Sequence, residues 1–113
     1  MRIDIKSSGI ELTAAQQAQI SQHVARVLAQ LKHRISKISL MLCEKDDPKG
    51  IIGKCCTVTL CSQGMENLVV SDTQAELNAA IERALQRINR TLLRRLKHDN
   101  HRANNGEFGY EEH

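Results

Sequence analysis

Five basic side chains near the C-terminus recur at intervals of three or four residues, a spacing that could bind a row of phosphate groups. On a helix, which turns about 100° per residue, they fall within about 80° of one another and form a stripe about 20 Å long. Arginine also presents a planar fork of donors that suits phosphate oxygens. This basic stripe consists of Arg83, Arg87, Arg90, Arg94 and Lys97. Arg95 lies to one side of it.

The distribution of charge along the chain supports a polyanionic partner. Residues 83–98 contain six basic residues and no acidic one, whereas residues 1–82 contain nine of each. Residues 99–113 hold four acidic residues and one basic residue. A neutral body, a basic segment and an acidic end therefore predict nucleic-acid binding through the basic segment.

A solvated helix surface with no ligand is the alternative interpretation of the basic stripe. Cations in the last turns of a helix interact favourably with its dipole, which accounts for Arg94, Arg95 and Lys97 without a partner. It does not account for Arg83 and Arg87 in mid-helix, nor for the absence of acidic residues among them in the sequence. We therefore favour nucleic-acid binding.

The aromatic content indicates how a nucleic acid would be recognised. Proteins that bind single strands stack bases on aromatic side chains. The only aromatic residues here are Phe108 and Tyr110. We therefore expect contacts with the phosphates and the shape of structured RNA or DNA.

A second, weaker basic cluster follows the first expected helix. It consists of Lys32, His33, Arg34 and Lys37. These residues could extend the nucleic-acid surface, and the favourable placement of cations at a helix end is an equally good explanation.

The hydrophobic pattern predicts the elements that position these side chains. Alternation of apolar and polar residues predicts strands, and apolar residues three or four apart predict helices. Thr13 and Gln16 have the spacing of a capping box, and Ser71 with Gln74, or Thr73 with Glu76, could begin the last helix in the same way. The expected elements are a strand over 1–6, a helix over about 14–32, strands over 37–44, 55–61 and 67–71, and a helix that ends near 98. A polar loop over 45–54 joins the second and third strands.

This order, β-α-β-β-β-α, predicts an α+β fold in which two helices pack on one face of a four-stranded sheet. If the inward residues of the central hairpin oppose one another, residues 42, 40 and 38 pair with 56, 58 and 60. The opposite face, partly open to solvent, then carries Ser39, Met41, Cys43, Cys55, Thr57, Thr59 and Cys61.

The length of 113 residues fits one domain, which we expect over 1–98, followed by a flexible acidic tail over 99–113. The sequence has no apolar run of the roughly 18 residues that cross a membrane, and its start lacks the apolar segment of a signal peptide. We therefore expect a cytoplasmic protein with reduced cysteines and no membrane partner.

The sequence over about residues 1–97 resembles the ribosome hibernation-promoting factors and ribosome-associated inhibitors. The resemblance rests on the order of the strands and on the segments "MRIDIKSSGIELT", "RISKISLML" and "ELNAAIERALQRINRTLLRRLK". The long loop "EKDDPKGIIGKC" resembles a divergent branch of that family. The end of the chain resembles the acidic extension of the inhibitor type.

The resemblance implies a fold similar to double-stranded-RNA-binding domains and a partner, the ribosome. Members of the family lodge in the small-subunit channel that tRNA and mRNA use, and so silence or protect idle ribosomes as stress factors. Basic residues on their last helix meet ribosomal RNA. Six residues of this chain lie on the matching helix: Arg83, Arg87, Arg90, Arg94, Arg95 and Lys97.

Two other functions remain open from the sequence. The open sheet face, with Met41, Thr57, Thr59 and Val69, could serve as a protein-interaction module or hold a homodimer together. Cys43 and Cys55 could form a redox-sensitive pair or, with His23, His33 or His98, a zinc site, although no C-x-x-C pair is present.

Enzymatic activity is not expected. The sequence contains no Gly-rich phosphate loop, no paired-carboxylate motif and no Cys-His-acid arrangement. We expect no cofactor and no small-molecule substrate.

Overall fold

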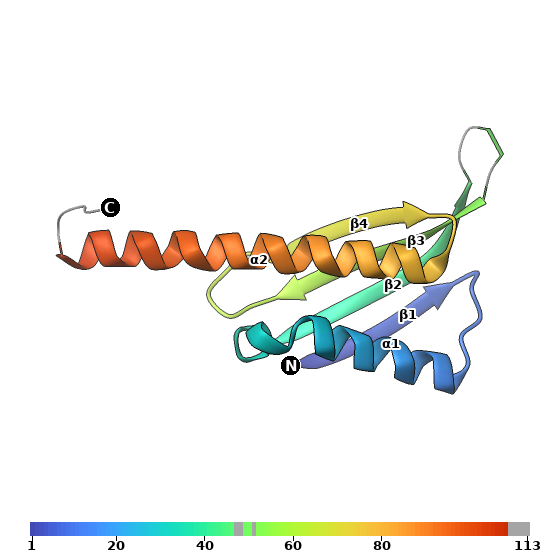
Figure 1. Ribbon diagram of the computed structural model, residues 1–113, viewed down its shortest axis with the longest axis horizontal. Helices are drawn as coiled ribbons and strands as arrows, with labels where there is room; N and C mark the ends of the chain where they lie inside the picture. Colours follow the sequence, from blue (N-terminus) through green and yellow to red (C-terminus); the bar gives the residue numbers. More distant parts are fainter. Residues whose placement is uncertain (47–48, 51, 109–113) are drawn as a thin grey trace.

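In a computed structural model, which describes residues 1–46, 49–50 and 52–108, the chain forms a four-stranded sheet and two long helices (Figure 1). In chain order the elements are β1 (Arg2–Ser8), α1 (Ala14–Val27), the 3-10 helix η1 (Ala29–Arg34), β2 (Lys37–Asp46), β3 (Ile52–Cys61), β4 (Leu68–Gln74) and α2 (Leu77–Phe108). This order confirms the predicted α+β class. No helix in the described part of the chain is long and apolar enough to cross a membrane.

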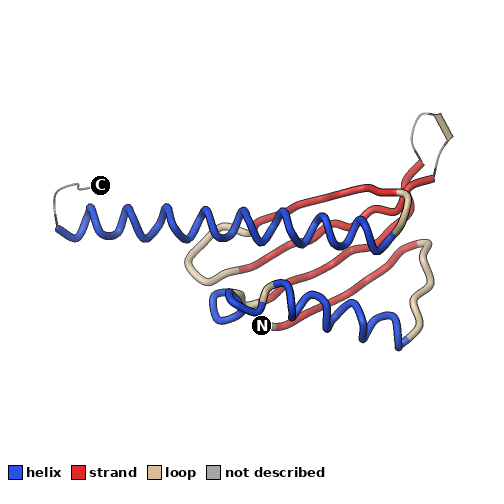
Figure 2. Tube along the Cα trace, viewed as in Figure 1, coloured by secondary structure: helices blue, strands red, loops and turns tan. Residues whose placement is uncertain are grey.

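The strands lie in the sheet in the order of the chain. β1 and β2 are parallel, with α1 in the crossover between them, and the pairs β2–β3 and β3–β4 are antiparallel. Figure 2 shows both helices on the same side of this sheet. Within the described residues, no element covers the other side, so the predicted open sheet face is confirmed.

The pairing of the central hairpin is the one that alternation predicts. Residues 38, 40 and 42 of β2 oppose residues 60, 58 and 56 of β3, and all six side chains are buried. Because successive side chains point to opposite faces of a sheet, this register places one aliphatic set beneath the helices and leaves the other set on the open sheet face.

The core is aliphatic and continuous between the sheet and the helices. α1 contributes Ile20 and Val24, and η1 is preceded by the buried Leu28. The core side chains of α2 share one face of the helix; they are Ala80, Ile81, Ala84, Leu85, Ile88 and Leu92. Burial of this face fixes the rotation of α2 about its axis, and so decides which side chains project outward.

The helix predicted over 14–32 is shorter than expected. α1 ends at Val27, and residues 29–34 form η1. In a 3-10 helix, residues three apart lie on the same side. This tighter winding places Leu31 beneath Leu28, so that both contact the core. The capping box at the start of α1 is confirmed, because Thr13 and Gln16 exchange hydrogen bonds of 2.9 and 3.1 Å.

The strands extend into segments that were expected to be loops or caps. β2 and β3 pair as far as Asp46 and Ile52, and the ion pair between the opposed residues Glu44 and Lys54 adds a cross-strand contact. Residues 47, 48 and 51 of the expected loop lie outside the described residues. β4 continues to Gln74, so Ser71 and Thr73 belong to a strand and the capping of α2 by either residue is wrong.

The end predicted for α2 is also wrong. The helix continues beyond residue 98 to Phe108, through residues that were expected to belong to a flexible tail. Once a helix has formed, each further residue adds one backbone hydrogen bond, so extension is easier than initiation. The segment also contains no proline, which would interrupt the helix. Residues 109–113 of the expected tail lie outside the described residues.

Candidate nucleic-acid interface

The basic stripe lies on the face of α2 that points away from the core. All five of its residues are exposed, whereas Ala84, Leu85, Ile88 and Leu92 on the opposite face are completely buried. Arg95 is half-buried at the side of the stripe. The amphipathic pattern of α2 therefore positions the charges as the sequence predicts.

Two residues of the stripe have an acidic partner that the sequence did not reveal. Asp72 of β4 lies 3.3 Å from Arg87 Nη1 and 3.7 Å from Arg83 Nε, both through its Oδ2 atom. Arg87 Nη1 also donates to the backbone oxygen of Ser71 at 2.9 Å. The expectation that the stripe lacks acidic partners is therefore wrong for Arg83 and Arg87, because an adjacent strand supplies one.

Asp72 is well placed to remain ionised. Its side chain is 10% exposed, and its other oxygen accepts a hydrogen bond of 2.7 Å from Gln74. The bond from Gln74 is the main cause that lowers the pKa of Asp72; burial opposes it, and Arg87 and Arg83 add to the lowering. A nearly buried carboxylate thus joins β4 to the N-terminal half of the stripe.

The C-terminal half of the stripe carries charge without a partner. Among the side chains that the structure describes, none forms an ion pair or a hydrogen bond with Arg90, Arg94 or Lys97. Leu93, which is 43% exposed, lies between them on the outer surface. These three cations are the part of the stripe that is most available to a ligand.

The second basic cluster also contains both cations with an acidic partner and cations without one among the described side chains. Lys32, His33 and Arg34 lie exposed on η1, whereas Lys37 is half-buried and forms an ion pair of 3.2 Å with Asp4. The backbone oxygen of Arg34 accepts a hydrogen bond from the Ser62 hydroxyl, which attaches η1 to the turn between β3 and β4. No side chain in the described part of the chain pairs with Lys32 or Arg34, whereas Lys37 pairs with Asp4 and keeps 45% of its side chain exposed.

Both clusters lie at one end of the molecule. In Figure 1, η1 and the turn between β3 and β4 occupy the end of the sheet past which α2 extends. α2 begins at the opposite end of the sheet and runs toward the end where η1 lies. Because the unpaired cations come after Ile88 in the sequence, they lie on the part of α2 nearer to that end. Basic residues from two segments far apart in the sequence thus gather around one end.

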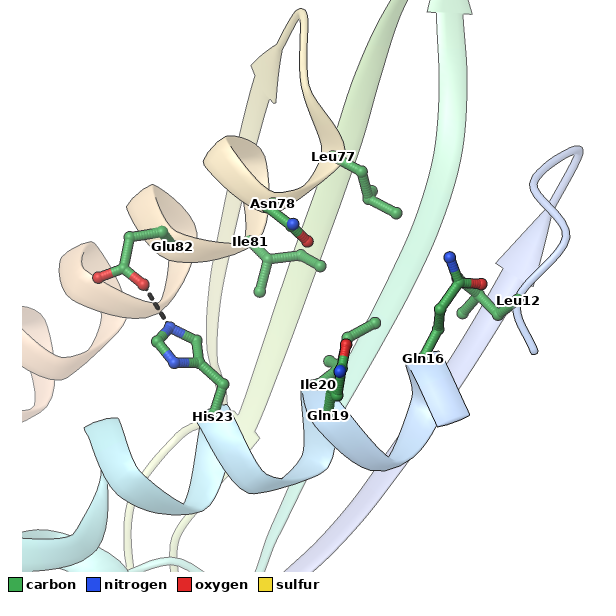
Figure 3. A pocket seen from close by; sticks show the side chains of 9 residues that line it. All are labelled: Leu12, Gln16, Gln19, Ile20, His23, Leu77, Asn78, Ile81 and Glu82. Carbon is green, nitrogen blue, oxygen red and sulfur yellow. Dashed lines mark hydrogen bonds and ion pairs between the residues drawn. The ribbon is translucent and has the colours of Figure 1, made fainter. Parts of the chain in front are cut away.

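A shallow groove between α1 and the start of α2 was not expected from the sequence. It has a volume of about 340 Å³ and an apolar floor that includes Leu12, Ile20, Leu77 and Ile81 (Figure 3). At one end, His23 Nε2 of α1 meets Glu82 Oε1 of α2, across 59 residues of sequence. The residues that line this groove include no serine, threonine or cysteine, so the His–Glu pair there has no nucleophile to activate.

The zinc site considered from the sequence does not form among the described residues. No group of three His, Cys, Asp or Glu side chains within them could hold a metal ion. His23 is paired with Glu82 in the groove between α1 and α2, and His33 is exposed on η1. Neither accompanies the cysteines of the open sheet face, and the side chain of His98 lies outside the described residues.

The four cysteines are unbridged and differ in their surroundings. Cys56 points into the core, and burial raises its pKa to about 12. Cys43 and Cys55 are direct cross-strand partners on the open sheet face, as the sequence predicts. Cys61 lies on the same face, opposite Lys37 at the far end of the hairpin.

Comparisons with known proteins agree with this fold. A family model described as sigma 54 modulation protein / S30EA ribosomal protein matches residues 3–99. A ribosomal subunit interface protein from Coxiella burnetii superposes with a TM-score of 0.71 at 12% identity, covering 86% of this chain and 99% of that one. The N-terminal domain of Thermus thermophilus Protein Y gives a TM-score of 0.65 at 20% identity, covering 83% and 98%. No curated protein matches the sequence.

Proposed function

The chain belongs to the sigma 54 modulation protein / S30EA ribosomal protein family, and on this premise we propose that it modulates translation by binding the small ribosomal subunit. The observation that carries the proposal is the row of unpaired cations on the outer face of α2: Arg90, Arg94 and Lys97. In this proposal they bind phosphates of small-subunit ribosomal RNA.

The electrostatics of α2 favour a bound polyanion. Like charges three or four residues apart on a helix destabilise it by about 0.2–0.5 kcal/mol per pair. Arg90 and Arg94 form such a pair, and Arg94 and Lys97 form another. Phosphates on the outer face would convert this repulsion into attraction and would release the counterions that surround the RNA.

The composition of the surface favours recognition of structured RNA. The open sheet face carries serine, threonine, cysteine and methionine, and residues 1–97 include no Phe, Tyr or Trp on which a base could stack. The means of recognition that remain are contacts with the RNA phosphates and with the shape of the RNA double helix. Lys32 and Arg34 on η1, at the same end of the molecule, would extend such a surface.

Isolated ribosomal subunits provide the test of this proposal. We expect the protein to sediment with purified small subunits and not with large subunits, and to be released steeply as salt increases. For contact with about four to six phosphates, the logarithm of the binding constant should fall with a slope of about −3 to −5 against the logarithm of salt concentration. Equal binding to both subunits, or binding insensitive to salt, would contradict the proposal.

A protein-interaction module is the second candidate function. Met41 and Val69 are 44% and 62% exposed, and both lie on the open sheet face beside Thr57 and Thr59. A homodimer or a protein complex formed there would persist at high salt. It would be lost when Met41 and Val69 are replaced by Ser, and would be unaffected by loss of the basic stripe.

A further inference from the structure

Two reduced cysteines face each other across the central hairpin. Cys43 of β2 and Cys55 of β3 are directly opposed in the antiparallel register. Directly opposed residues have Cβ atoms about 4.5–5.5 Å apart. A disulfide requires a Cβ separation of about 3.5–4.5 Å and tolerates Cα separations of about 4.4–6.8 Å. A shift of about 1 Å would therefore allow a bond between the two sulfur atoms without a change of register.

The neighbours of Cys55 stabilise its thiolate. Thr73 opposes it on β4, and the Thr57 hydroxyl lies 4.0 Å from its Sγ atom. Burial acts to raise the pKa of Cys55, but hydrogen bonds with Thr73 and Thr57 and the charge of Lys45 leave it lowered. The pKa of Cys43 is raised, first by burial and then by Cys55. When one sulfur of the pair is ionised, it is that of Cys55.

The two sulfurs differ in their access to solvent. Cys43 is half-buried, and Cys55 is only 2% exposed. A reagent larger than water therefore meets Cys43 first. Cys55, with its stabilised thiolate, is the adjacent residue across the strands.

From this arrangement we propose that Cys43 and Cys55 form a site of reversible thiol–disulfide exchange, which takes a low-molecular-weight disulfide such as oxidised glutathione as its oxidant. Cys43 Sγ attacks one sulfur of the reagent while its proton passes to the adjacent Cys55 thiolate; a new S–S bond forms and one thiolate leaves. Cys55 gives that proton to the departed thiolate, and the Cys55 thiolate then attacks Cys43 Sγ and displaces the second thiolate. The two protons lost by the cysteines end on the two released thiolates, so the protein loses two electrons and the reagent gains them.

The other two cysteines cannot replace either partner. Cys56 points to the opposite face of the sheet and its high pKa keeps it protonated. Cys61 is six residues along β3 from Cys55, about 20 Å away at the usual rise of a strand. The exchange site is therefore specific to one pair, and it lies across the sheet from the helices. It does not depend on the proposed binding of ribosomal RNA.

Peptide mapping of the folded protein tests the proposal. The full chain is incubated with oxidised glutathione, quenched with acid, alkylated and digested with trypsin. Cleavage after Lys37, Lys45, Lys54 and Arg83 places Cys43 in fragment 38–45 and Cys55 in fragment 55–83. We expect the two fragments to be joined by a disulfide in mass spectrometry, and to separate after treatment with reduced dithiothreitol.

Variants identify the partners. Cys61→Ser, the control on the same face, should retain the linked fragments. Cys55→Ser should lose them and accumulate a glutathione adduct on Cys43. Cys43→Ser should form no adduct at residue 55 while the protein is folded. Cys55→Ala, checked by circular dichroism, replaces Cys55→Ser if the serine prevents folding.

Three outcomes would overturn the proposal. The first is the absence of linked fragments in the wild-type protein. The second is a link that persists in the variant at residue 55, which would mean pairing through Cys56 or Cys61. The third is a link that forms only in urea, which would show that the folded hairpin prevents the exchange.

Discussion

Asp72 of β4 and Arg87 of α2 are joined by a hydrogen bond of 3.3 Å between Oδ2 and Nη1. The same oxygen atom lies 3.7 Å from Arg83 Nε. Two residues of the basic stripe therefore attach α2 to the edge strand of the sheet, while Arg90, Arg94 and Lys97 keep their charges unpaired among the described side chains. The stripe has a structural half and a half that is available for binding.

Replacement of Asp72 by Asn should lower the free energy of unfolding by about 1–2 kcal/mol at pH 7, because two charge-assisted contacts are lost. The folded pKa of Asp72 is lowered, so its contribution is present above the unfolded pKa near 4 and is lost as pH falls through the folded value. Urea unfolding at pH 7 and pH 2.5 measures this. A difference between wild type and Asp72→Asn that is as large at pH 2.5 as at pH 7 would contradict the role of the carboxylate.

Neutralisation of single cations should separate the two halves of the stripe. Arg90→Gln, Arg94→Gln and Lys97→Gln should each reduce the salt slope of ribosome binding by about 0.7–0.9, with no loss of stability, because each change removes a like-charge repulsion. Arg83→Gln should act mainly on stability, because its partner is Asp72. Lys6→Gln, an exposed change on the open sheet face, is the matched control. Equal effects of all four changes in the stripe on the slope would contradict this division.

The apolar face of α2 should be far more sensitive to truncation than its outer face. Leu85 is completely buried and Leu93 is 43% exposed on the same helix. Leu85→Ala should lower the free energy of unfolding by about 2–5 kcal/mol, whereas Leu93→Ala should change it by about 0.5 kcal/mol or less. Thermal or urea unfolding of the two variants checks the rotation of α2 about its axis, and similar losses in both would contradict it.

The capping box of α1 should contribute to stability on its own. The Thr13 hydroxyl accepts a hydrogen bond of 3.1 Å from the Gln16 backbone. Thr13→Ala should therefore lower the free energy of unfolding by about 1 kcal/mol, and Thr13→Ser should retain most of it. The same loss in both variants would show that the hydroxyl is not the group responsible.

Local patterns in the sequence predicted most of the fold. Alternation indicated which residues of the hairpin point inward, because a slip of one residue would move the aliphatic side chains to the other face. Pairing the inward residues with one another placed Leu40 opposite Val58 and Cys43 opposite Cys55. The same reasoning placed the basic stripe on the outer face of α2. These features depend on residues close in sequence or on a single hairpin.

Contacts between distant segments were not predicted. The pairing of Asp72 with Arg83 and Arg87, and that of His23 with Glu82, depend on how α2 lies on the sheet and beside α1. One signal did exist for the first of these. Asp72 follows Leu68 and Val70 in the inward series of β4, where an acidic residue needs a partner.

The ends of the two helices are also not predicted correctly from the sequence. The sequence does not locate the end of α1, because Leu28 and Leu31 fit both an α-helix and a 3-10 helix, whose periods differ little over one turn. The polar composition after residue 98 suggested a tail, but polar residues alone do not end a helix.

Co-sedimentation of a charge-reversed variant with ribosomes tests the central claim most directly. The double variant Arg90→Glu, Arg94→Glu reverses two unpaired cations of the stripe, and Lys6→Glu, Lys45→Glu makes the same change in charge at exposed positions on the open sheet face. We expect the wild type and the control to pellet with small subunits at low salt, and the stripe variant, folded by circular dichroism, to remain in the supernatant. Pelleting of the stripe variant to the same extent as the wild type would contradict the account.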